Sequence, residues 1–424
     1  MAPLQFLIDH ALTKTPAERP VWIALSGGLD SCLLLALAAH AAHSHPRAIY
    51  ALHVNHGLQA AASDFECHCR AFCSRLGVPL FVEHVHVEPA GKGIEAAARE
   101  ARYAAFARRV KTGETLWLAQ HGDDQAETLL LAALRGSGAR GLAAMPFARV
   151  WQGRRLTRPL LGHTRADLER EAQSLVLHWV EDPSNRNTDL DRNFLRGRVI
   201  PLLASRWPDA PRALARSAQL AGEADALLDE LAALDLAAVG GEPRRMLITA
   251  LLALSEARQR LLVRYACQHL GLPTPPLRRL TALLSQLDSG DDAQVHVGWP
   301  GGEARCWRGG LYLQVPQAEP PADWQVKWDG KPGLTTPLGR VACRLACEGE
   351  TRPRLRVTLR HGGESLRVAG RGRRDVKRLL QEANVPPWQR SRQLLVWHDD
   401  MLIAVLGVAL AEGWSQLGPA FDDG

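Results

Sequence analysis

A glycine turn between a buried strand and a helix constrains the fold of this chain more than any other stretch. Ser26-Gly27-Gly28-Leu29-Asp30-Ser31 follows the apolar run at residues 21–25 and precedes the helix-forming run at residues 32–39. Two adjacent glycines let the backbone turn tightly and present its N–H groups to a ligand. The first helical turn adds N–H groups without partners and a partial positive charge. This order predicts a loop that holds a phosphate or pyrophosphate at a helix start.

Asp30 suggests that a metal ion accompanies the phosphate. A carboxylate in an anion-binding loop repels phosphate unless a cation such as Mg²⁺ lies between them. The alternative is an ordinary strand-to-helix turn in which Asp30 and Ser31 cap the helix. The loop is not a Walker A motif, because no Gly-Lys-Ser/Thr follows the glycines.

The first 211 residues alternate between strand and helix patterns, which predicts a Rossmann-like doubly wound parallel sheet. We expect strands at residues 21–25, 48–54, 80–85, 116–119 and 155–161, and helices that include residues 65–76 and 94–106. Ligands of open parallel sheets bind beyond the carboxyl ends of the strands. Ser26, His53, His56 and His121 follow strand ends, so these residues indicate a single site.

Three carboxylates begin the helix after the fourth strand. Asp123, Asp124 and Glu127 share a face at spacings of three and four residues. Acidic residues in a first helical turn are also ordinary helix caps, and that alternative stays open. Their position beside the phosphate loop favours a role in holding Mg²⁺ or a substrate ammonium group. His121 is a candidate for nucleotide contact or proton transfer.

Two further patterns follow in the same part of the chain. Residues 136–141 match GxGxxG but follow a helix, so we interpret them as a mobile loop that closes over the site and not as a dinucleotide motif. A turn is predicted at residues 182–185. Arg192 and Arg196 fall on one helix face, which suits phosphate contact, although a solvated helix face has the same spacing.

The remaining sequence predicts three smaller regions: helical at 212–288, short strands and a linker at 289–351, and a small α+β module at 352–424. Residues 354–360 alternate as an edge strand would, and residues 402–406 read as a final strand. A basic loop with Arg373, Arg374 and Lys377 enters a helix and could grip a phosphate backbone. Trp388 is a candidate platform for base stacking. An arginine-rich solvated surface is the alternative for each of these cations.

Composition narrows the class of protein. The formal charge of +6 fits a polyanionic partner, and eight cysteines are too few for a disulfide scaffold. Cys67, Cys69 and Cys73 are expected to be structural thiols sooner than metal ligands. Charged residues near the N-terminus argue against a signal peptide, and the apolar runs are too short to span a bilayer. These features predict a cytoplasmic enzyme without membrane partners.

An ordered set of motifs resembles a known family. SGGLDS at Ser26 is similar to the pyrophosphate loop of the N-type ATP pyrophosphatases, or PP-loop enzymes. The further matching segments are HVNHGL at His53, GIEAAAREARYAAF at Gly93, AQHGDDQAET at Ala119, LRGSGARGL at Leu134, RPLL at Arg158 and EDPSNRNTDLDRNFLR at Glu181. Each motif is weak by itself, but together and in this order they resemble the tRNA(Ile)-lysidine synthase family.

The resemblance implies an ATP-dependent ligase that attaches L-lysine to C2 of the wobble cytidine of tRNA(Ile) with a CAU anticodon. It implies ATP and Mg²⁺ as cofactors, tRNA contacts by the helical and C-terminal regions, and it allows a homodimer. Residues assigned to ATP are Ser26, Gly27, Gly28, Leu29, Asp30, Ser31 and His53. Assigned to catalysis are Asp30, His121, Asp123, Asp124 and Glu127, with Asp30, Asp123 and Asp124 as tentative Mg²⁺ ligands. Candidates for phosphate or tRNA contact are Arg99, Arg102, Arg192, Arg196, Arg373, Arg374 and Lys377.

Three alternatives remain open at this stage. A sulfur-inserting tRNA enzyme would share the loop, but it typically needs paired or catalytic cysteines, and the sequence has no CxxC. An ammonia-using amidotransferase would show a glutaminase module, and none is apparent. A non-catalytic RNA-binding protein would be expected to have lost the loop or the acidic cluster, and both are intact.

Overall fold

The computed structural model describes residues 4–57, 62–87, 94–182, 188–288, 295–321, 323–347 and 354–421. The chain forms two compact units, Met1–Leu231 and Ala232–Gly424. The boundaries proposed above at residues 211, 288 and 351 stay predictions. Of the turn expected at residues 182–185, only Asp182 is among the described residues.

The first unit is built on a six-stranded sheet of order β3-β2-β1-β4-β6-β5. Its strands are β1 Val21–Ala24, β2 Ile49–Asn55, β3 Leu80–His84, β4 Thr115–Trp117, β5 Ala148–Trp151 and β6 Arg154–Thr157. All neighbours are parallel except β5, which pairs antiparallel with β6 at the edge. The expected doubly wound parallel sheet is therefore confirmed. The fifth expected strand ends at Thr157, four residues earlier than its pattern suggested.

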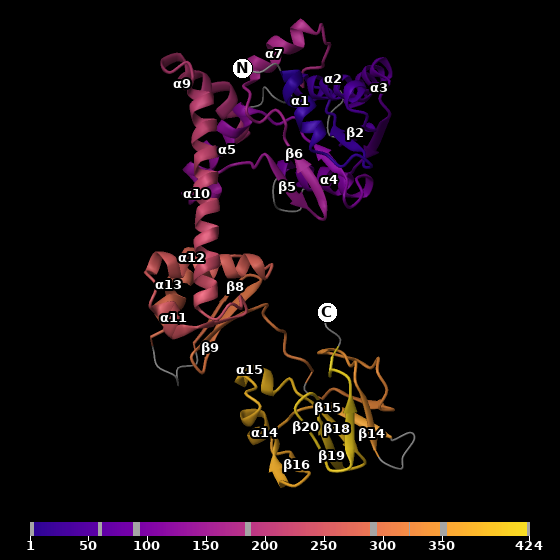
Figure 1. The fold of residues 1–424 in the computed structure, drawn as a ribbon, viewed down its shortest axis with the longest axis vertical. Helices are drawn as coiled ribbons and strands as arrows, with labels where there is room; N and C mark the ends of the chain where they lie inside the picture. The colour runs from indigo at the N-terminus through magenta and orange to yellow at the C-terminus, as the bar shows by residue number, and fades with distance from the viewer. Residues whose placement is uncertain are drawn as a thin grey trace. The chain divides into compact units, whose positions relative to one another are not determined.

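Helices cover both faces of this sheet because successive strand residues point to opposite sides. Ile23 packs into one core with α1 Leu4–Thr13, α2 Leu29–Ser44 and α3 Ala62–Leu76, whereas Trp22 packs into a second core with α4 Ile94–Arg109. The other helical segments of this unit are α5 Gly122–Leu134, α6 Ala139–Leu142, α7 Arg165–Ser174, α8 Asp191–Phe194, the π-helix Leu195–Val199 and α9 Ile200–Arg206. The long helix α10 Ala210–Ala238 is continuous across the boundary between the units (Figure 1).

The first half of the second unit has one core shared by helices and strands. The sheet has the order β7-β10-β9-β8, and Met246, Leu262, Leu280 and Leu311 lie together beneath it. The elements are β7 Arg245–Leu247, α11 Ile248–Leu252, α12 Glu256–His269, α13 Leu277–Leu284, β8 His296–Trp299, β9 Gly302–Trp307 and β10 Gly310–Gln314. The helices and the short strands of this half share one hydrophobic core.

The C-terminal half is built on an antiparallel sheet of order β11-β15-β18-β19-β20. Its strands are β11 Gln325–Trp328, β15 Leu355–Leu359, β18 Leu394–His398, β19 Met401–Val405 and β20 Ala409–Leu410. Smaller pairs are formed by β12 Thr335–Thr336 with β13 Gly339–Arg340, β14 Arg344–Cys347 with β21 Trp414–Leu417, and β16 Ser365–Val368 with β17 Gly372–Asp375. Two short helices, α14 Val376–Glu382 and α15 Pro387–Arg390, complete this half.

Two expectations for this half are wrong. Residues 354–360 do not form an edge strand, because β15 lies between β11 and β18. Its polar positions are covered by Trp397, whose Nε1 donates to Thr358 Oγ1 at 2.9 Å and whose ring lies 5.4 Å from the Arg356 guanidinium carbon. Residues 402–406 are followed by β20 and β21, so β19 is not the final strand.

No helix in the described ranges is both long enough and apolar enough to cross a membrane.

Candidate active site

The glycine loop has a fixed conformation at the carboxyl end of β1. Gly27 has φ +90°, and a Cβ at this position would lie 3.2 Å from Cys69 Sγ, so both the backbone and the packing favour glycine. The Ser31 hydroxyl donates to the Gly28 carbonyl at 3.0 Å, and the Ser26 and Ser31 hydroxyls lie 3.0 Å apart. The Ser26 backbone N–H also donates to Ser31 Oγ at 3.1 Å. These hydrogen bonds hold the loop in one conformation.

A cavity of about 710 Å³ opens beside this loop. It lies beyond β1, β2 and β4, where parallel α/β sheets bind ligands. The residues expected at the strand ends do come together, because Ser26, His53, His56 and His121 all line it. Its charged lining consists of Arg102, Arg165, Arg192 and Arg196 with Asp30, Asp124, Glu181 and Asp182, and its aromatic lining includes Phe65, Tyr103, Phe106 and Trp179.

Gly28 is the N-cap residue of α2 and has no side chain to accept from the first turn. The N–H groups that begin a helix lack partners within it and carry partial positive charge. Gly28, Leu29, Asp30 and Ser31 all line the cavity. This helix start is therefore suited to an anionic ligand.

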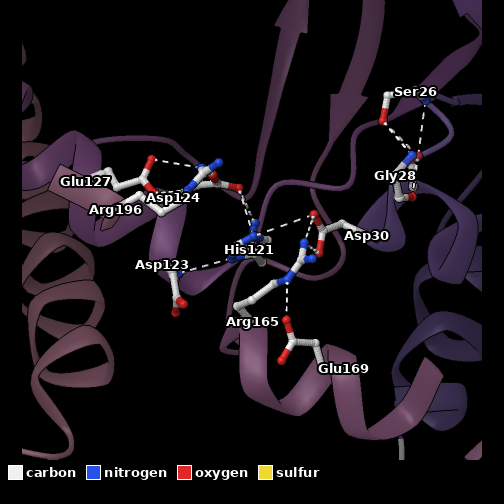
Figure 2. Close-up of polar contacts among 11 residues, drawn as sticks. Ser26, Gly28, Asp30, His121, Asp123, Asp124, Glu127, Arg165, Glu169 and Arg196 are labelled. Atoms are coloured by element: carbon white, nitrogen blue, oxygen red, sulfur yellow. Dashed lines mark hydrogen bonds and ion pairs between the residues drawn. The ribbon is translucent and has the colours of Figure 1, made fainter. Parts of the chain in front are cut away.

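His121 is buried at the start of α5 and lies between two carboxylates (Figure 2). Its Nδ1 accepts from the Asp123 backbone N–H at 3.3 Å, so the ring proton belongs on Nε2. Nε2 is 3.8 Å from Asp30 Oδ2 and 3.6 Å from Asp124 Oδ2. Protonating Nδ1 would break the helix cap. The Nε2–H of His121 therefore faces both carboxylates, at distances longer than a hydrogen bond.

Arg196 binds the carboxylates on α5. Its Nε donates to Glu127 Oε1 at 2.7 Å, and its Nη2 donates to Asp124 Oδ1 at 3.0 Å (Figure 2). Glu127 is fully buried, and burial raises the pKa of its carboxyl while Arg196 acts in the opposite direction. Asp124 and Arg196 line the cavity, so Glu127 contributes by holding Arg196 from behind.

Asp123 is placed differently from its neighbours. Its carboxylate points away from Asp30 in Figure 2, and it is not among the residues that line the cavity. Burial raises the pKa of this carboxyl, while His121 and a hydrogen bond from the Arg165 backbone N–H oppose the shift. Asp123 therefore contacts the start of α7 and not the cavity.

Arg165 is a site residue that the sequence analysis missed. Its Nη1 donates to both oxygens of Asp30, at 2.7 and 2.6 Å, and its Nε donates to Glu169 Oε1 at 2.9 Å. It begins α7, in the segment that follows β6. The rule that sites lie beyond parallel strands could have located this segment, but the partner Asp30 lies 135 residues away.

Gly122 was also missed. Its N–H donates to the His163 carbonyl at 2.6 Å, and a Cβ at this position would lie 2.9 Å from the same oxygen. Backbone cannot move aside as a flexible side chain can. The glycine therefore permits the close approach of α5 to the segment before α7.

His53 and Cys69 lie beside the glycine loop. His53 Nδ1 donates to the Leu25 carbonyl at 2.9 Å, and burial lowers its pKa, which favours the neutral ring. Cys69 and Cys73 are buried, and burial raises the pKa of Cys73 to about 11. Cys67 is exposed. Buried, protonated thiols fit packing roles.

The remaining candidate arginines of the first unit differ in position. Arg102 and Arg192 line the cavity. Arg99 is outside that lining, and its guanidinium carbon lies 4.9 Å from the centre of the Tyr103 ring. Arg192 Nη2 donates to Thr128 Oγ1 at 3.4 Å, which ties α8 to α5.

The expected mobile loop at residues 136–141 contains the start of α6 and is attached to α10. Arg140 Nε donates to Asp225 Oδ2 at 2.9 Å, and its Nη2 donates to Asp229 Oδ1 at 2.6 Å. Residues 136–141 are not among those that line the cavity. The interpretation of this segment as a loop closing over the site is therefore not supported.

The predicted basic loop of the second unit is β17 and the start of α14. Arg373 Nε donates to Ser365 Oγ at 2.6 Å, and Arg374 Nε donates to the Arg371 carbonyl at 3.1 Å. Both partners are uncharged, so these contacts leave the positive charge uncompensated. Lys377 is exposed in the first turn of α14.

Trp388 is packed against other rings. Its ring centre lies 5.4 Å from Tyr312 and 6.5 Å from Trp307, both in edge contacts. The Arg305 guanidinium carbon lies 5.4 Å from its centre. A base-stacking role would have to displace these contacts, so the structure gives Trp388 a packing role.

Two carboxylates that line the cavity, Asp30 and Asp124, are candidate ligands for a magnesium ion. Within the described ranges, no group of three or more His, Cys, Asp or Glu side chains is arranged to hold a metal ion. Mg²⁺ is, however, often bound by one or two carboxylates together with substrate phosphates. Asp30 and Asp124 line the cavity and fit that mode, whereas Asp123 does not line it.

Comparisons with known proteins agree with this geometry. A PP-loop domain model matches residues 4–203, a TilS substrate binding domain model matches residues 247–312, and a TilS substrate C-terminal domain model matches residues 355–420. The tRNA(Ile)-lysidine synthase of Pseudomonas aeruginosa is 46% identical over 96% of this chain and 93% of its own length. The proteins of the same name from Xanthomonas axonopodis pv. citri and Serratia proteamaculans are 42% and 41% identical, over 97% and 93% of this chain and 97% and 92% of their own lengths.

Proposed function

Because this chain belongs to the tRNA(Ile)-lysidine synthase family, we propose that its cavity uses ATP to join L-lysine to C2 of the wobble cytidine of tRNA(Ile) with a CAU anticodon. One observation carries the proposal: a single cavity combines a glycine loop at a helix start with carboxylates and arginines at the ends of parallel strands. Such a cavity can hold a nucleotide and two further reactants. A cytoplasmic location is part of the proposal, because ATP and tRNA meet there.

The chemistry requires a better leaving group on the base. The C2 carbonyl oxygen of cytidine attacks the α-phosphorus of ATP, and pyrophosphate leaves. The neutral ε-amine of lysine then attacks C2, and AMP leaves with the oxygen. The protein contributes mainly by positioning the reactants and by neutralising charge.

The glycine loop is the proposed site of the pyrophosphate. The N–H groups at the start of α2 and the hydroxyls of Ser26 and Ser31 can donate to phosphate oxygens. Asp30 and Asp124 would hold Mg²⁺ there, and the ion would supply positive charge for the departing pyrophosphate. His121 Nε2 lies between the two carboxylates, 3.8 Å from Asp30 Oδ2 and 3.6 Å from Asp124 Oδ2.

Lysine would bind beside the same cluster. A carboxylate such as Asp124 is suited to an ammonium group, and Arg192 is suited to the α-carboxylate. Both residues line the cavity.

The tRNA would also contact the second unit. The β17–α14 segment presents the exposed Arg373 and Lys377 and the half-buried Arg374, and the two arginines donate to uncharged oxygens. Such cations suit a phosphate backbone and give salt-sensitive affinity. The homodimer that the resemblance allows stays a prediction, which a solution mass measurement tests.

The decisive experiment measures pyrophosphate release and attachment of radiolabelled lysine to a tRNA(Ile) transcript with a CAU anticodon. Release that depends on this tRNA, with lysine attached, supports the proposal. Turnover only with a sulfur donor or ammonia would instead assign a related activity. The absence of turnover, with RNA still bound, would favour a binding protein.

A pair of variants locates the chemistry in the cavity. Asp124→Asn removes a carboxylate that lines it, and lysine attachment should fall by at least about tenfold. Asp209→Asn is the matched control, because its side chain is 88% exposed and it is outside the lining. Equal activity of both variants would contradict the proposed site.

A further inference from the structure

Arg165 occupies the oxygens of Asp30 that a metal ion would need. One nitrogen, Nη1, lies 2.7 Å from Oδ1 and 2.6 Å from Oδ2 (Figure 2). Both residues line the cavity. An arginine on both oxygens competes with a divalent cation for this carboxylate, because the two positive charges repel one another.

A second anchor keeps the guanidinium at the cavity. Arg165 Nε donates to Glu169 Oε1 at 2.9 Å, one turn further along α7. The helix start is fixed by a capping box in which Thr164 and Asp167 bond reciprocally. The guanidinium can therefore release Asp30 while remaining bound to Glu169.

We propose that Arg165 is a positioning residue that holds Asp30 in the absence of nucleotide and moves onto a phosphate when the metal-bound nucleotide arrives. This inference rests on the proposed function, because it assumes that nucleotide phosphates bind at the glycine loop. Arginine pairs well with phosphate through its planar fork of donors, so the phosphate offers a replacement for the lost carboxylate.

The exchange makes metal and nucleotide binding depend on each other. A metal ion without nucleotide competes with Arg165 for Asp30, and the guanidinium then loses both hydrogen bonds from Nη1 without a replacement partner. A metal ion that arrives with phosphates supplies the replacement partner. The nucleotide-free protein should therefore bind divalent cations weakly, and Arg165→Gln should remove that penalty.

The test uses Mn²⁺ as a probe, and the EPR signal of free Mn²⁺ reports binding without any turnover. In the absence of nucleotide, Arg165→Gln should bind Mn²⁺ about tenfold more tightly than the wild type, since a partly exposed positive charge beside the ligand has been removed. With ATP present, the same variant should bind nucleotide several-fold more weakly. Arg165→Lys, which keeps the charge but loses the fork, should leave Mn²⁺ binding weak.

Two controls locate the effect. Arg170→Gln lies on the same helix, pairs with Asp167 and has a side chain that is 73% exposed, so Mn²⁺ binding should not change. In an Asp30→Asn background, Arg165→Gln should no longer increase Mn²⁺ affinity. Circular dichroism of each variant checks that the fold is retained.

Two results would overturn the inference: equal Mn²⁺ affinity of Arg165→Gln and the wild type, or an increase that persists with Asp30→Asn. Failure of the proposed function looks different. If the lysine chemistry fails, the Mn²⁺ results stand but no lysine is attached to the tRNA; if the glycine loop holds no nucleotide, the wild type does not bind ATP with Mn²⁺, whatever residue stands at position 165.

Discussion

Gly122 offers the most direct test of how the two halves of the site are held together. Its N–H donates to the His163 carbonyl at 2.6 Å, and an added Cβ would lie 2.9 Å from that oxygen. Ordinary contact begins near 3.4 Å, so Gly122→Ala must push the backbone apart by about 0.5 Å. Because Arg165 follows two residues after His163, the displacement should also move it away from Asp30.

The magnitude follows from two opposing effects. Forcing an extra methyl group into a packed position costs about 1–3 kcal/mol. Replacing glycine by alanine in a compatible backbone returns about 0.4–1 kcal/mol, because the unfolded chain loses freedom. The free energy of unfolding of Gly122→Ala should therefore fall by about 1–2 kcal/mol relative to the wild type.

Gly162→Ala is the matched control. It lies on the same opposing segment, its φ is not in the left-handed region, and nothing lies within 4 Å of its added Cβ. Urea denaturation of both variants, with ATP affinity measured in parallel, separates the steric clash from the entropic gain. A Gly122→Ala variant as stable as Gly162→Ala would refute the packing argument.

The remaining predictions concern charge, thiols and RNA binding. Arg196→Gln should destabilise the fold by about 1–3 kcal/mol at neutral pH, because it leaves Glu127 buried without its cation. Burial raises the pKa of Glu127 in the folded state above its reference value of 4.5. The destabilisation caused by Arg196→Gln should therefore be smallest below pH 4.5 and grow as the pH rises. A difference between the urea midpoints of variant and wild type that does not change with pH would contradict this. Iodoacetamide at pH 8 should modify the exposed Cys67 in the native protein and leave the buried Cys73 intact, as mass spectrometry would show. Arg373→Ala should lower the slope of log affinity for tRNA against log salt by about one unit, and an unchanged slope would exclude a phosphate contact.

Much of the catalytic unit could be predicted from local sequence. The apolar runs at β1, β2 and β4 and the helical runs between them predict a parallel sheet, because strands and helices differ in the period of their buried residues. The adjacent glycines at positions 27 and 28 predict a tight turn, and φ at Gly27 is in the region that glycine favours. The rule for strand ends then brings Ser26, His53 and His121 to one cavity.

Two interpretations lacked partners that are distant in the sequence. Residues 354–360 alternate as an edge strand does, but the cover that Trp397 provides for the polar face comes from another strand. The glycine-rich stretch at residues 136–141 reads as a loop, but its attachment depends on Asp225 and Asp229, more than 80 residues away. Local periodicity contains no information about either partner.

The sequence by itself therefore determined the sheet, the glycine loop and the chemical types gathered at the edge of the sheet, because these depend on residues that are neighbours in the chain. Only the tertiary structure decided which charges pair. Asp30 is held by Arg165, 135 residues away, and Glu127 by Arg196, 69 residues away. The strength of an ion pair depends on distance and burial in space, and neither can be read from spacing along the chain.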